Sequence, residues 1–345
     1  MTKQFDTIVY IGRFQPLHNA HIVMLHKASV LAKQVIVVVG SANQPRTVKN
    51  PFTSDERIQL LSESVHRYVS GDGTKFIFEP NEDTVYNNGA WCIRVQNIVA
   101  KYTSKTDRIA IIGHKKDETT FYLNMFPQWE FVDQPLVEPL NATQIRDAYF
   151  TPELNNINWF KGVVPETTID FLSRFVQTSD YHKLVKEKEF LVKCKLPYAG
   201  LPYEPVFTTA DMCVFQSGHV LMGIRKSEPG KGLLAFPGGY LNAATDRSCF
   251  DAAIRELYEE TRLKVPEKVL RGSIVGEKVF DAIGRSERGR IITHAYKAVL
   301  PDGELPKVRG SDDLQFAAWY PISEISRQDC FEDHYDILQY FVNLE

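Results

Sequence analysis

The sequence predicts two domains, an alternating α/β domain followed by an α+β domain, and three observations lead to this prediction. The chain has 345 residues, which is long for a single hydrophobic core. Its first half alternates short β-branched runs with helical patterns, whereas its second half has strands with one strong helix among them. Between the halves, three prolines and a glycine within 196–205 predict a linker.

The first domain, expected over 1–195, is predicted to contain an open parallel sheet. Four apolar runs predict its buried strands, at 7–11, 35–39, 76–79 and 109–112. Three of these runs end at a glycine, namely Gly12, Gly40 and Gly113. In such sheets, ligands bind beyond the carboxyl ends of the strands. Helical patterns follow at 21–31, at 54–69 after a cap at Thr53 or Ser54, and over most of 165–195.

The second domain, expected over 206–345, has a different pattern. Strands are predicted at 206–215, 220–224, 291–300 and 316–320, and helices at 248–262 and at the C-terminus. Strands that are not separated by regular helices are typical of an α+β fold.

Composition restricts the class of protein. Hydrophobic residues make up 43% and charged residues 24%, as in soluble globular proteins. The net charge of -3 gives no electrostatic reason to expect nucleic acid or an anionic membrane as a partner. The five cysteines form no CxxC pair, which argues against a disulfide framework or a zinc site. With no signal peptide and no span-length apolar run, we expect a cytoplasmic protein.

The segment GRFQPLHNAH at 12–21 is the first with a chemical pattern. Gly12 follows a strand and allows a close approach of a phosphate to the backbone. A helix begins after it, and its free N–H groups attract anions. His18 and His21 are three residues apart, so both imidazoles can reach one phosphate. Taken alone, such a pair is more often structural, but its place after a strand-terminal glycine favours binding.

This segment resembles the (H/T)xGH signature of the nucleotidyltransferase superfamily, in the form typical of NMN adenylyltransferases. The resemblance implies that His18 and His21 bind ATP phosphates and stabilise the charge that moves onto pyrophosphate. It also implies ATP contacts from Gly12, Arg13 and Phe14. The glycine that the family has between the two histidines is alanine in this sequence.

A second segment, LNATQIR at 140–146, precedes a helical run. Asn141 or Thr143 is well suited to cap that helix. The segment also resembles the SxTxIR motif of the same superfamily, where a helix N-terminus and an arginine hold the ATP phosphates. The resemblance implies that Asn141, Thr143 and Arg146 bind ATP and that Arg146 takes part in catalysis.

Further segments resemble the archaeal-type NMN adenylyltransferases. The resemblance implies that Phe14, Arg46, Asn87 and Trp91 contact NMN. An indole can stack on a cationic nicotinamide ring, and the alternative for Trp91 is a core aromatic. The resemblance also implies that the loop after the fourth strand binds the adenosine side of ATP through Gly113, His114 and Asp117. Because the NMN phosphate is already ionised, positioning and charge neutralisation suffice for catalysis, with Mg²⁺ and no general base.

The second chemical pattern is Arg255 followed by three glutamates in the 248–262 helix. Glu256, Glu259 and Glu260 occupy positions i, i+3 and i+4, so their carboxylates share one face. Clustered carboxylates suit Mg²⁺ or Mn²⁺, and the alternative is a solvated acidic face.

With the glycine pair of FPGGY upstream, this helix resembles the Nudix box, GX5EX7REUXEEXGU. The resemblance implies a metal site formed by Gly238, Glu256, Glu259 and Glu260, the three glutamates being catalytic. The sequence departs from the box in three ways. The loop between Gly239 and Arg255 is two residues longer, and the first glutamate is lost, with Asp246 or Arg247 nearest to its position. The late glycine of the box is replaced by Arg262. Arg285 and Arg288 lie in a segment that resembles the substrate loop of ADP-ribose-type enzymes and are expected to bind a diphosphate.

Together, the two halves resemble bifunctional bacterial NMN adenylyltransferase/Nudix hydrolases. The resemblance implies a Rossmann-like nucleotidyltransferase domain followed by an α/β/α-sandwich Nudix domain. The expected substrates are NMN, ATP and ADP-ribose. Two alternatives stay open: a transferase with another acceptor, such as pantetheine phosphate or a flavin mononucleotide, and a Nudix domain that senses a ligand without cleaving it. A DNA-binding role has little support, because no basic patch or helix-turn-helix accompanies the Nudix segment.

Overall fold

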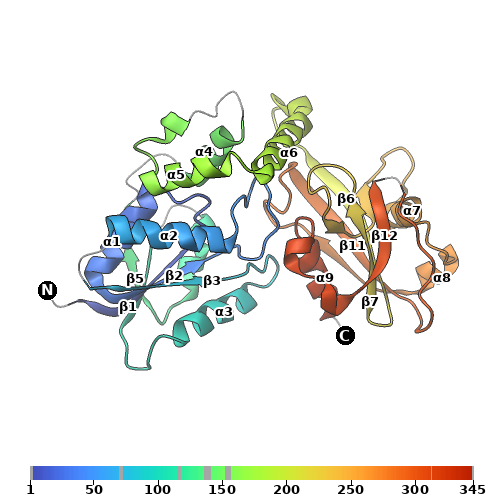
Figure 1. The fold of residues 1–345 in the computed structure, drawn as a ribbon. Helices are drawn as coiled ribbons and strands as arrows, with labels where there is room; N and C mark the ends of the chain where they lie inside the picture. Colours follow the sequence, from blue (N-terminus) through green and yellow to red (C-terminus); the bar gives the residue numbers. More distant parts are fainter. Residues whose placement is uncertain are drawn as a thin grey trace. The chain divides into compact units, whose positions relative to one another are not determined.

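A computed structural model shows the chain as two compact units, Met1–Lys188 and Glu189–Glu345 (Figure 1). The structure describes residues 3–69, 73–114, 118–135, 141–151, 157–311 and 313–343. The two units are described separately below.

The N-terminal unit contains a five-stranded parallel sheet with the order β3-β2-β1-β4-β5. Its strands are β1 (Phe5–Gly12), β2 (Ala32–Val39), β3 (Lys75–Pro80), β4 (Ile109–Gly113) and β5 (Glu130–Asp133). In register, Gly12 is paired with Val39 and Tyr10 with Ile112. The carboxyl ends of β1, β2 and β4 therefore meet at one edge of the sheet, as the strand-terminal glycines predicted.

Helices cover both faces of this sheet (Figure 1). Helices α1 (Asn19–Leu31) and α2 (Ser54–Tyr68) pack on one face and α3 (Asn88–Ala100) on the other. The further helices are α4 (Ala142–Tyr149), α5 (Glu166–Phe175) and α6 (Ser179–Lys195), with 3-10 helices at Glu118–Met125 and Ile157–Phe160. The start of α2 is well determined, because Thr53 Oγ1 accepts a hydrogen bond from the Glu56 N–H and the Glu56 carboxylate accepts one from the Thr53 N–H.

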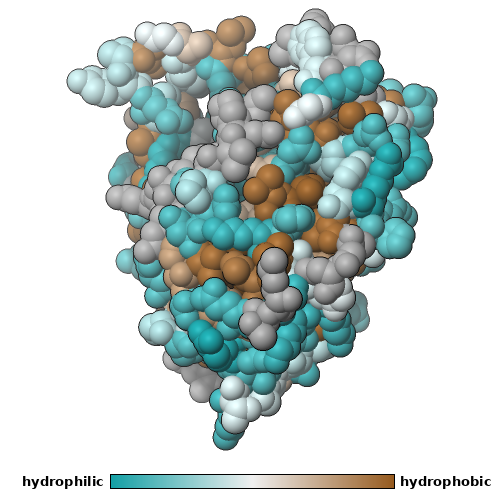
Figure 2. All heavy atoms as spheres, turned by 90° about the vertical axis from the view of Figure 1, so that its left-hand side faces the viewer, coloured by the Kyte–Doolittle hydropathy of each residue, from teal (hydrophilic) through white to brown (hydrophobic). Residues whose placement is uncertain are grey.

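Alternate residues of β1 enter two hydrophobic cores, one on each side of the sheet. Ile8 and Tyr10 pack with α1 and α2, whereas Val9 and Ile11 pack with α3. This double coverage explains why β1 and β2 read as almost continuous apolar runs. The face of this unit shown in Figure 2 is mostly hydrophilic, with hydrophobic atoms in limited areas.

The C-terminal unit contains a mixed seven-stranded sheet with the path β10-β11-β6-β7-β12, while β8 pairs with β7 and β9 with β6. Its strands are β6 (Val206–Gln216), β7 (His219–Arg225), β8 (Leu234–Ala235), β9 (Gly238–Tyr240), β10 (Ile274–Phe280), β11 (Arg290–Val299) and β12 (Leu314–Pro321). Among the strand pairs of the described residues, β11 and β6 run parallel to each other and the other pairs are antiparallel.

Three α-helices accompany this sheet, α7 (Cys249–Thr261), α8 (Glu267–Gly272) and α9 (His334–Val342), together with short 3-10 helices at Ile322–Glu324 and Arg327–Asp329. The apolar face of α7 contributes Ala253, Ile254 and Leu257 to the core, where they pack with residues of β6 and β11. This packing leaves Glu260 of α7 in contact with Gly238, the first residue of β9.

The boundary between the units falls inside α6, between Lys188 and Glu189, whereas the sequence placed the end of the first domain at 195. After α6 comes the 3-10 helix Leu196–Tyr198, and 199–205 have no helix or strand. In the described ranges, none of the helices has both the length and the apolar character needed to span a bilayer.

Candidate active sites

The loop after β1 brings the two predicted histidines to the carboxyl edge of the first sheet. A Cβ on Gly12 would lie 2.8 Å from the Phe14 ring, so only glycine fits beneath that ring. Phe14 is buried and has a positive φ of 52°. Its ring contacts His21 with centroids 4.8 Å apart. Strand, loop and helix start thus form one packed turn that ends at the histidines.

His18 and His21 stand as a stacked pair at the start of α1. Their ring centroids are 3.7 Å apart, and the His18 backbone N–H donates to His21 Nδ1 at 3.1 Å. Burial lowers the pKa of His18 to about 4, and burial together with His18 holds that of His21 well below its ordinary value. Within the described residues, buried His18 Nδ1 has no hydrogen-bond partner. Both rings are therefore neutral at pH 7, and His18 has a polar atom left for a ligand.

Arg146 connects the two transferase motifs. Its guanidinium donates to the Gln15 carbonyl at 2.8 Å and to Thr143 Oγ1 at 3.1 Å. The side chain is only 6% exposed. Two segments far apart in the sequence therefore meet at one place, as the resemblance implied.

Asn141 caps α4. Its Oδ1 accepts hydrogen bonds from the N–H groups of Thr143 and Gln144, and Gln144 Oε1 accepts one from the Asn141 N–H. The capping interpretation is therefore correct for Asn141. The N-terminus of α4 therefore lies near Arg146. An anion is favoured there, because a helix N-terminus carries a positive dipole end.

Arg57 holds the loops after β1 and β2, a role that the sequence did not reveal. It is 1% exposed, and its guanidinium donates to the carbonyls of Arg13 (2.6 Å), Gly40 (2.7 Å) and Ser41 (3.0 Å). Burial lowers its pKa to about 10, so it remains a cation at pH 7. A buried cation that binds three carbonyls fixes the two loops and adds positive potential beneath them. Arg13 itself is exposed.

The residues predicted for the NMN side have other contacts in the structure. Arg46 is engaged by Glu56, in two hydrogen bonds of 2.7 and 2.8 Å, and by Asp180 at 3.1 Å. Asn87 caps α3 by accepting from the Ala90 N–H. The geometry shows an ion-pair role for Arg46 and a capping role for Asn87, and their contact with NMN stays a prediction.

Trp91 is partly buried. Its ring lies 6.1 Å from that of Tyr122 and 6.0 Å from that of Phe126, centroid to centroid, against the α3-side core. This environment matches the core-aromatic alternative on one side of the ring, while stacking on nicotinamide stays a prediction.

On the adenosine side, Gly113 ends β4, and a Cβ there would lie 2.7 Å from the Leu123 side chain. The nearby His114 has its Nδ1 4.0 Å from Asp133 Oδ1 at the end of β5. The third predicted residue, Asp117, lies outside the described residues.

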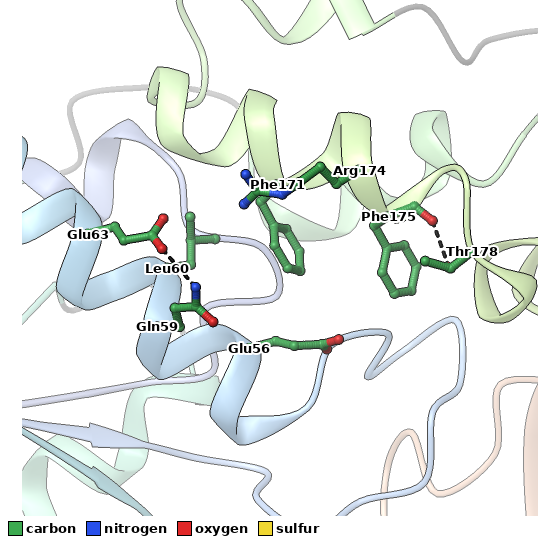
Figure 3. Close-up of a pocket in the computed structure, with 8 residues that line it drawn as sticks. All are labelled: Glu56, Gln59, Leu60, Glu63, Phe171, Arg174, Phe175 and Thr178. Carbon is green, nitrogen blue, oxygen red and sulfur yellow. Dashed lines mark hydrogen bonds between the residues drawn. The ribbon is translucent and has the colours of Figure 1, made fainter.

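A pocket of about 330 Å³ lies between α2 and α5 (Figure 3). Two phenylalanines of α5 point from one side toward α2, which contributes three polar side chains and a leucine. Its lining residues are Glu56, Gln59, Leu60, Glu63, Phe171, Arg174, Phe175 and Thr178. None of the side chains predicted to bind ATP or NMN lines this pocket, so it adds nothing to the assignment of the transferase site.

In the C-terminal unit, Arg255 organises the acidic face of α7. Its guanidinium binds Asp246 through two hydrogen bonds of 2.8 and 2.9 Å, Glu256 at 2.8 Å and Glu259 at 2.9 Å. Asp246, one of the two residues nearest to the lost first glutamate of the Nudix pattern, is therefore paired with the arginine of the helix. The longer loop curls back to do so, since Asp246 Oδ2 accepts from the Asn242 N–H.

Glu260 is the most deeply buried carboxyl of this face, at 3% exposure. Its Oε2 accepts a hydrogen bond from the Gly238 N–H at 2.9 Å. Burial raises its pKa to about 9, because the single backbone donor does not compensate for lost water. A Cβ on Gly239 would lie 2.5 Å from Glu256 Oε1, so the second glycine makes room for another carboxylate.

The predicted metal residues are only partly assembled. Gly238 and Glu260 are in contact, whereas Glu256 and Glu259 are ion-paired with Arg255. In the described ranges, no group of three His, Cys, Asp or Glu side chains is arranged to hold a metal ion. The donor set still fits a hard divalent cation, because it consists of oxygens and includes a buried carboxyl that a cation would stabilise in its ionised form.

Gly238, Glu256 and Glu260 line a pocket of about 400 Å³, whereas Glu259 is not among its lining residues. Arg285, predicted to bind a diphosphate, lines this pocket and is held by Asp333 through two hydrogen bonds of 2.7 and 2.8 Å, with both side chains almost fully buried. Its contact with a diphosphate stays a prediction. Arg288 also lines the pocket, 3.3 Å from Glu332 and over the rings of Tyr240 and Phe331.

Several further pocket residues carry no local sequence motif: Asp211, Arg225, Asp313, Glu332 and His334. Asp211 lies inside β6, accepts from Thr293 Oγ1 at 2.5 Å, and has its pKa raised to about 6 by burial. His334 Nδ1 accepts from the Phe236 N–H at 3.0 Å, and burial lowers its pKa to about 3. A charged residue inside a strand that is otherwise uncharged and mostly buried was the signal that could have identified Asp211.

Two protein families match the chain. The Cytidylyltransferase-like family matches residues 9–147, and the NUDIX domain family matches residues 206–341. A nicotinamide/nicotinic acid mononucleotide adenylyltransferase from Acinetobacter baylyi is 34% identical over 186 residues, which is 54% of this chain and 94% of that protein. A nicotinamide-nucleotide adenylyltransferase from Pyrococcus abyssi is 25% identical over 198 residues, covering 55% of this chain and 97% of that protein.

A solved structure from Francisella tularensis, described as a bifunctional NMN adenylyltransferase/ADP ribose pyrophosphatase, covers 99% of this chain and 99% of its own, with 31% identity and a TM-score of 0.89. The chain belongs to this bifunctional family. Another structure of the Francisella tularensis enzyme, complexed with AMP and a Mn ion, covers 98% of each chain at 30% identity and a TM-score of 0.88. Membership confirms the predicted fold class, a Rossmann-like nucleotidyltransferase domain followed by a Nudix domain.

In this chain, Arg262 stands where the Nudix box has a glycine, and this departure affects the backbone conformation. It is the C-cap of α7 and has the left-handed backbone, with φ 51° and ψ 32°. Glycine adopts that conformation without steric cost, whereas an arginine is strained there.

Proposed function

We propose that the N-terminal unit transfers the adenylyl group of ATP to NMN, forming NAD and releasing pyrophosphate, and that the C-terminal unit hydrolyses ADP-ribose to AMP and ribose 5-phosphate. The observation that carries the proposal is the match over 99% of both chains to a bifunctional enzyme described with these two activities. Local geometry in each unit supports it.

For the transferase, support comes from the group of donors at the carboxyl edge of the sheet. These donors are His18, the start of α1, the start of α4 and Arg146. Arg146 connects the two segments through its hydrogen bonds to Gln15 and Thr143. Such donors would hold the ATP phosphates and neutralise charge as pyrophosphate leaves. A neutral imidazole beside a phosphate gains a proton more readily, so His18 and His21 suit a site where negative charge grows.

For the hydrolase, support comes from the pocket around Glu260. Glu256, Glu259 and Glu260 would hold Mg²⁺ or Mn²⁺, with Gly238 beside them. When bound, the metal would supply charge neutralisation at the diphosphate and an activated water. Arg288 lines the same pocket and carries the positive charge suited to a phosphate. Arg255 is ion-paired with both Glu256 and Glu259, and of these two glutamates Glu256 lines the pocket.

Two incubations of the full chain test the proposal, one with NMN, ATP and Mg²⁺ and one with ADP-ribose and Mg²⁺ or Mn²⁺. Chromatography should show NAD and pyrophosphate in the first, and AMP and ribose 5-phosphate in the second. Formation of a dinucleotide with another acceptor only would refute the NMN assignment. Binding of ADP-ribose without release of AMP would establish the ligand sensor instead.

Each unit supplies the control for the other. His18→Ala and His21→Ala should each lower NAD synthesis at least about a hundredfold, the scale for losing one preorganised donor, and leave ADP-ribose hydrolysis unchanged. Glu260→Gln should abolish AMP release and leave NAD synthesis intact. A variant that lost both activities would indicate a folding defect rather than a site residue.

A further inference from the structure

A second pocket of the C-terminal unit, separate from the hydrolase pocket, is lined by cations. It measures about 510 Å³ and lies between the end of α7 and the loop 307–311. Arg262 and Lys264 line it from one side, and Lys307 and Arg309 from the other. No carboxylate lines it within the described part of the chain.

The loop 307–311, which forms one wall of this pocket, is held in place by hydrogen bonds and packing. The Arg309 N–H donates to the Thr261 carbonyl at 2.7 Å, and the Ser311 N–H donates to the Glu260 carbonyl at 2.8 Å. A Cβ on Gly310 would lie 2.7 Å from Phe316 Cα, so the loop is packed tightly onto β12. The cations are therefore mounted on a fixed backbone, which lowers the entropy lost when a ligand binds.

Stabilisation of the helix does not by itself explain these cations. A cation near the C-terminus of α7 would interact favourably with the helix dipole. However, the last carbonyls of α7 already accept hydrogen bonds from the loop, and two of the four cations come from that loop. Four like charges around one concavity repel one another unless an anion is bound among them.

Arg262 gives a second, independent observation. It occupies a left-handed position that glycine would hold without strain, and its guanidinium lines the pocket and donates to Ser311 Oγ at 3.2 Å. A strained residue that the surrounding structure maintains is a reason to look for a function of its side chain. Here the side chain adds the fourth positive charge.

We propose that this pocket binds a small phosphate-bearing anion, such as inorganic pyrophosphate or the polyphosphate group of a free nucleotide. Arginine and lysine are the side chains that bind phosphate oxygens, and the pocket volume is in the range of small-molecule sites. The chain as a whole is acidic, with a net charge of -3, so the positive charge is local to this concavity and no extended basic surface for nucleic acid is implied.

The test is a calorimetric titration of the full chain with inorganic pyrophosphate, at low salt and with EDTA to prevent metal-bridged binding in the hydrolase pocket. Lys307→Gln/Arg309→Gln should lose one binding event per chain, or weaken it roughly tenfold or more. The matched control is Lys193→Gln/Lys268→Gln, which removes two exposed lysines of the same unit outside the pocket and should keep that event. ATP and AMP titrations then distinguish a nucleotide from the inorganic anion.

Arg262→Gly separates binding from folding, because it removes a cation while relieving backbone strain. We expect weaker pyrophosphate binding together with an unchanged or higher Tm, a combination that a structural defect cannot produce. Equal binding by the unmodified chain and the Lys307→Gln/Arg309→Gln variant would overturn the proposal. Equal loss in the control pair would do the same, and so would binding of a single-stranded oligonucleotide at this pocket without any pyrophosphate event.

Discussion

Raising the pH of the metal-free protein should destabilise its C-terminal unit, because Glu260 is protonated in the fold and ionised in the unfolded chain. The carboxyl is 3% exposed and accepts one hydrogen bond, from the Gly238 N–H. Burial raises its pKa from 4.5 to about 9. Between these two values the unfolded state binds fewer protons than the native state, so stability must fall as the pH rises.

The slope follows from one proton. Between pH 4.5 and 9 the free energy of unfolding should fall by roughly 1.4 kcal/mol per pH unit. From pH 7.0 to 8.5 this amounts to about 2 kcal/mol, or a decrease in Tm of about 4–8 °C for a unit of this size. Above pH 9 the native carboxyl ionises too and the loss levels off. Adding Mn²⁺ should flatten the slope, since a bound cation favours the ionised carboxylate.

The assay is urea unfolding in EDTA at several pH values between 7.0 and 8.5. This window avoids the other buried groups of the pocket, because the pKa of Asp211 is raised only to about 6 and that of His334 is lowered to about 3. Glu260→Gln should remove the slope. Glu267→Gln, which neutralises a side chain that is 55% exposed, should retain it. A slope that persists in Glu260→Gln, or is missing from the unmodified protein, would refute the reasoning.

Three further predictions concern single residues. Trp91→Ala should raise the KM for NMN more than that for ATP, by the roughly 1–2 kcal/mol of a lost stacking contact, whereas equal effects in steady-state kinetics would point to the packing against Tyr122 and Phe126. Gly239→Ala should lower ADP-ribose hydrolysis sharply with NAD synthesis unchanged, because its Cβ would lie 2.5 Å from Glu256 Oε1; near-normal AMP release would show that Glu256 can move aside. Asp333→Ala should destabilise the unit by about 3–5 kcal/mol by leaving Arg285 buried without its partner, and denaturant unfolding that shows less than 1 kcal/mol would contradict this.

Much of the N-terminal unit could be predicted because its signals are local. Continuous apolar runs marked β1, β2 and β4, and the glycines that end them marked the edge where the motifs meet. Strands β5 and β10 were not predicted, because β5 has only four residues and the apolar residues of β10 are interrupted by Gly276, Glu277 and Lys278. Their position in a sheet depends on the neighbouring strand that they pair with.

The sequence by itself determined the family, the two fold classes and the helical face that carries Glu256, Glu259 and Glu260, because periodicity and motif spacing are properties of adjacent residues. The tertiary structure alone decided which charges are paired. Arg285 is predicted to bind a diphosphate and lines the pocket, but only the fold shows that Asp333, 48 residues later in the chain, is its ion-pair partner. Partners at such separations are chosen by the packing of whole elements. Burial then sets the pKa of each charged group. Neither the partner of a charge nor its burial can be predicted from a local sequence pattern.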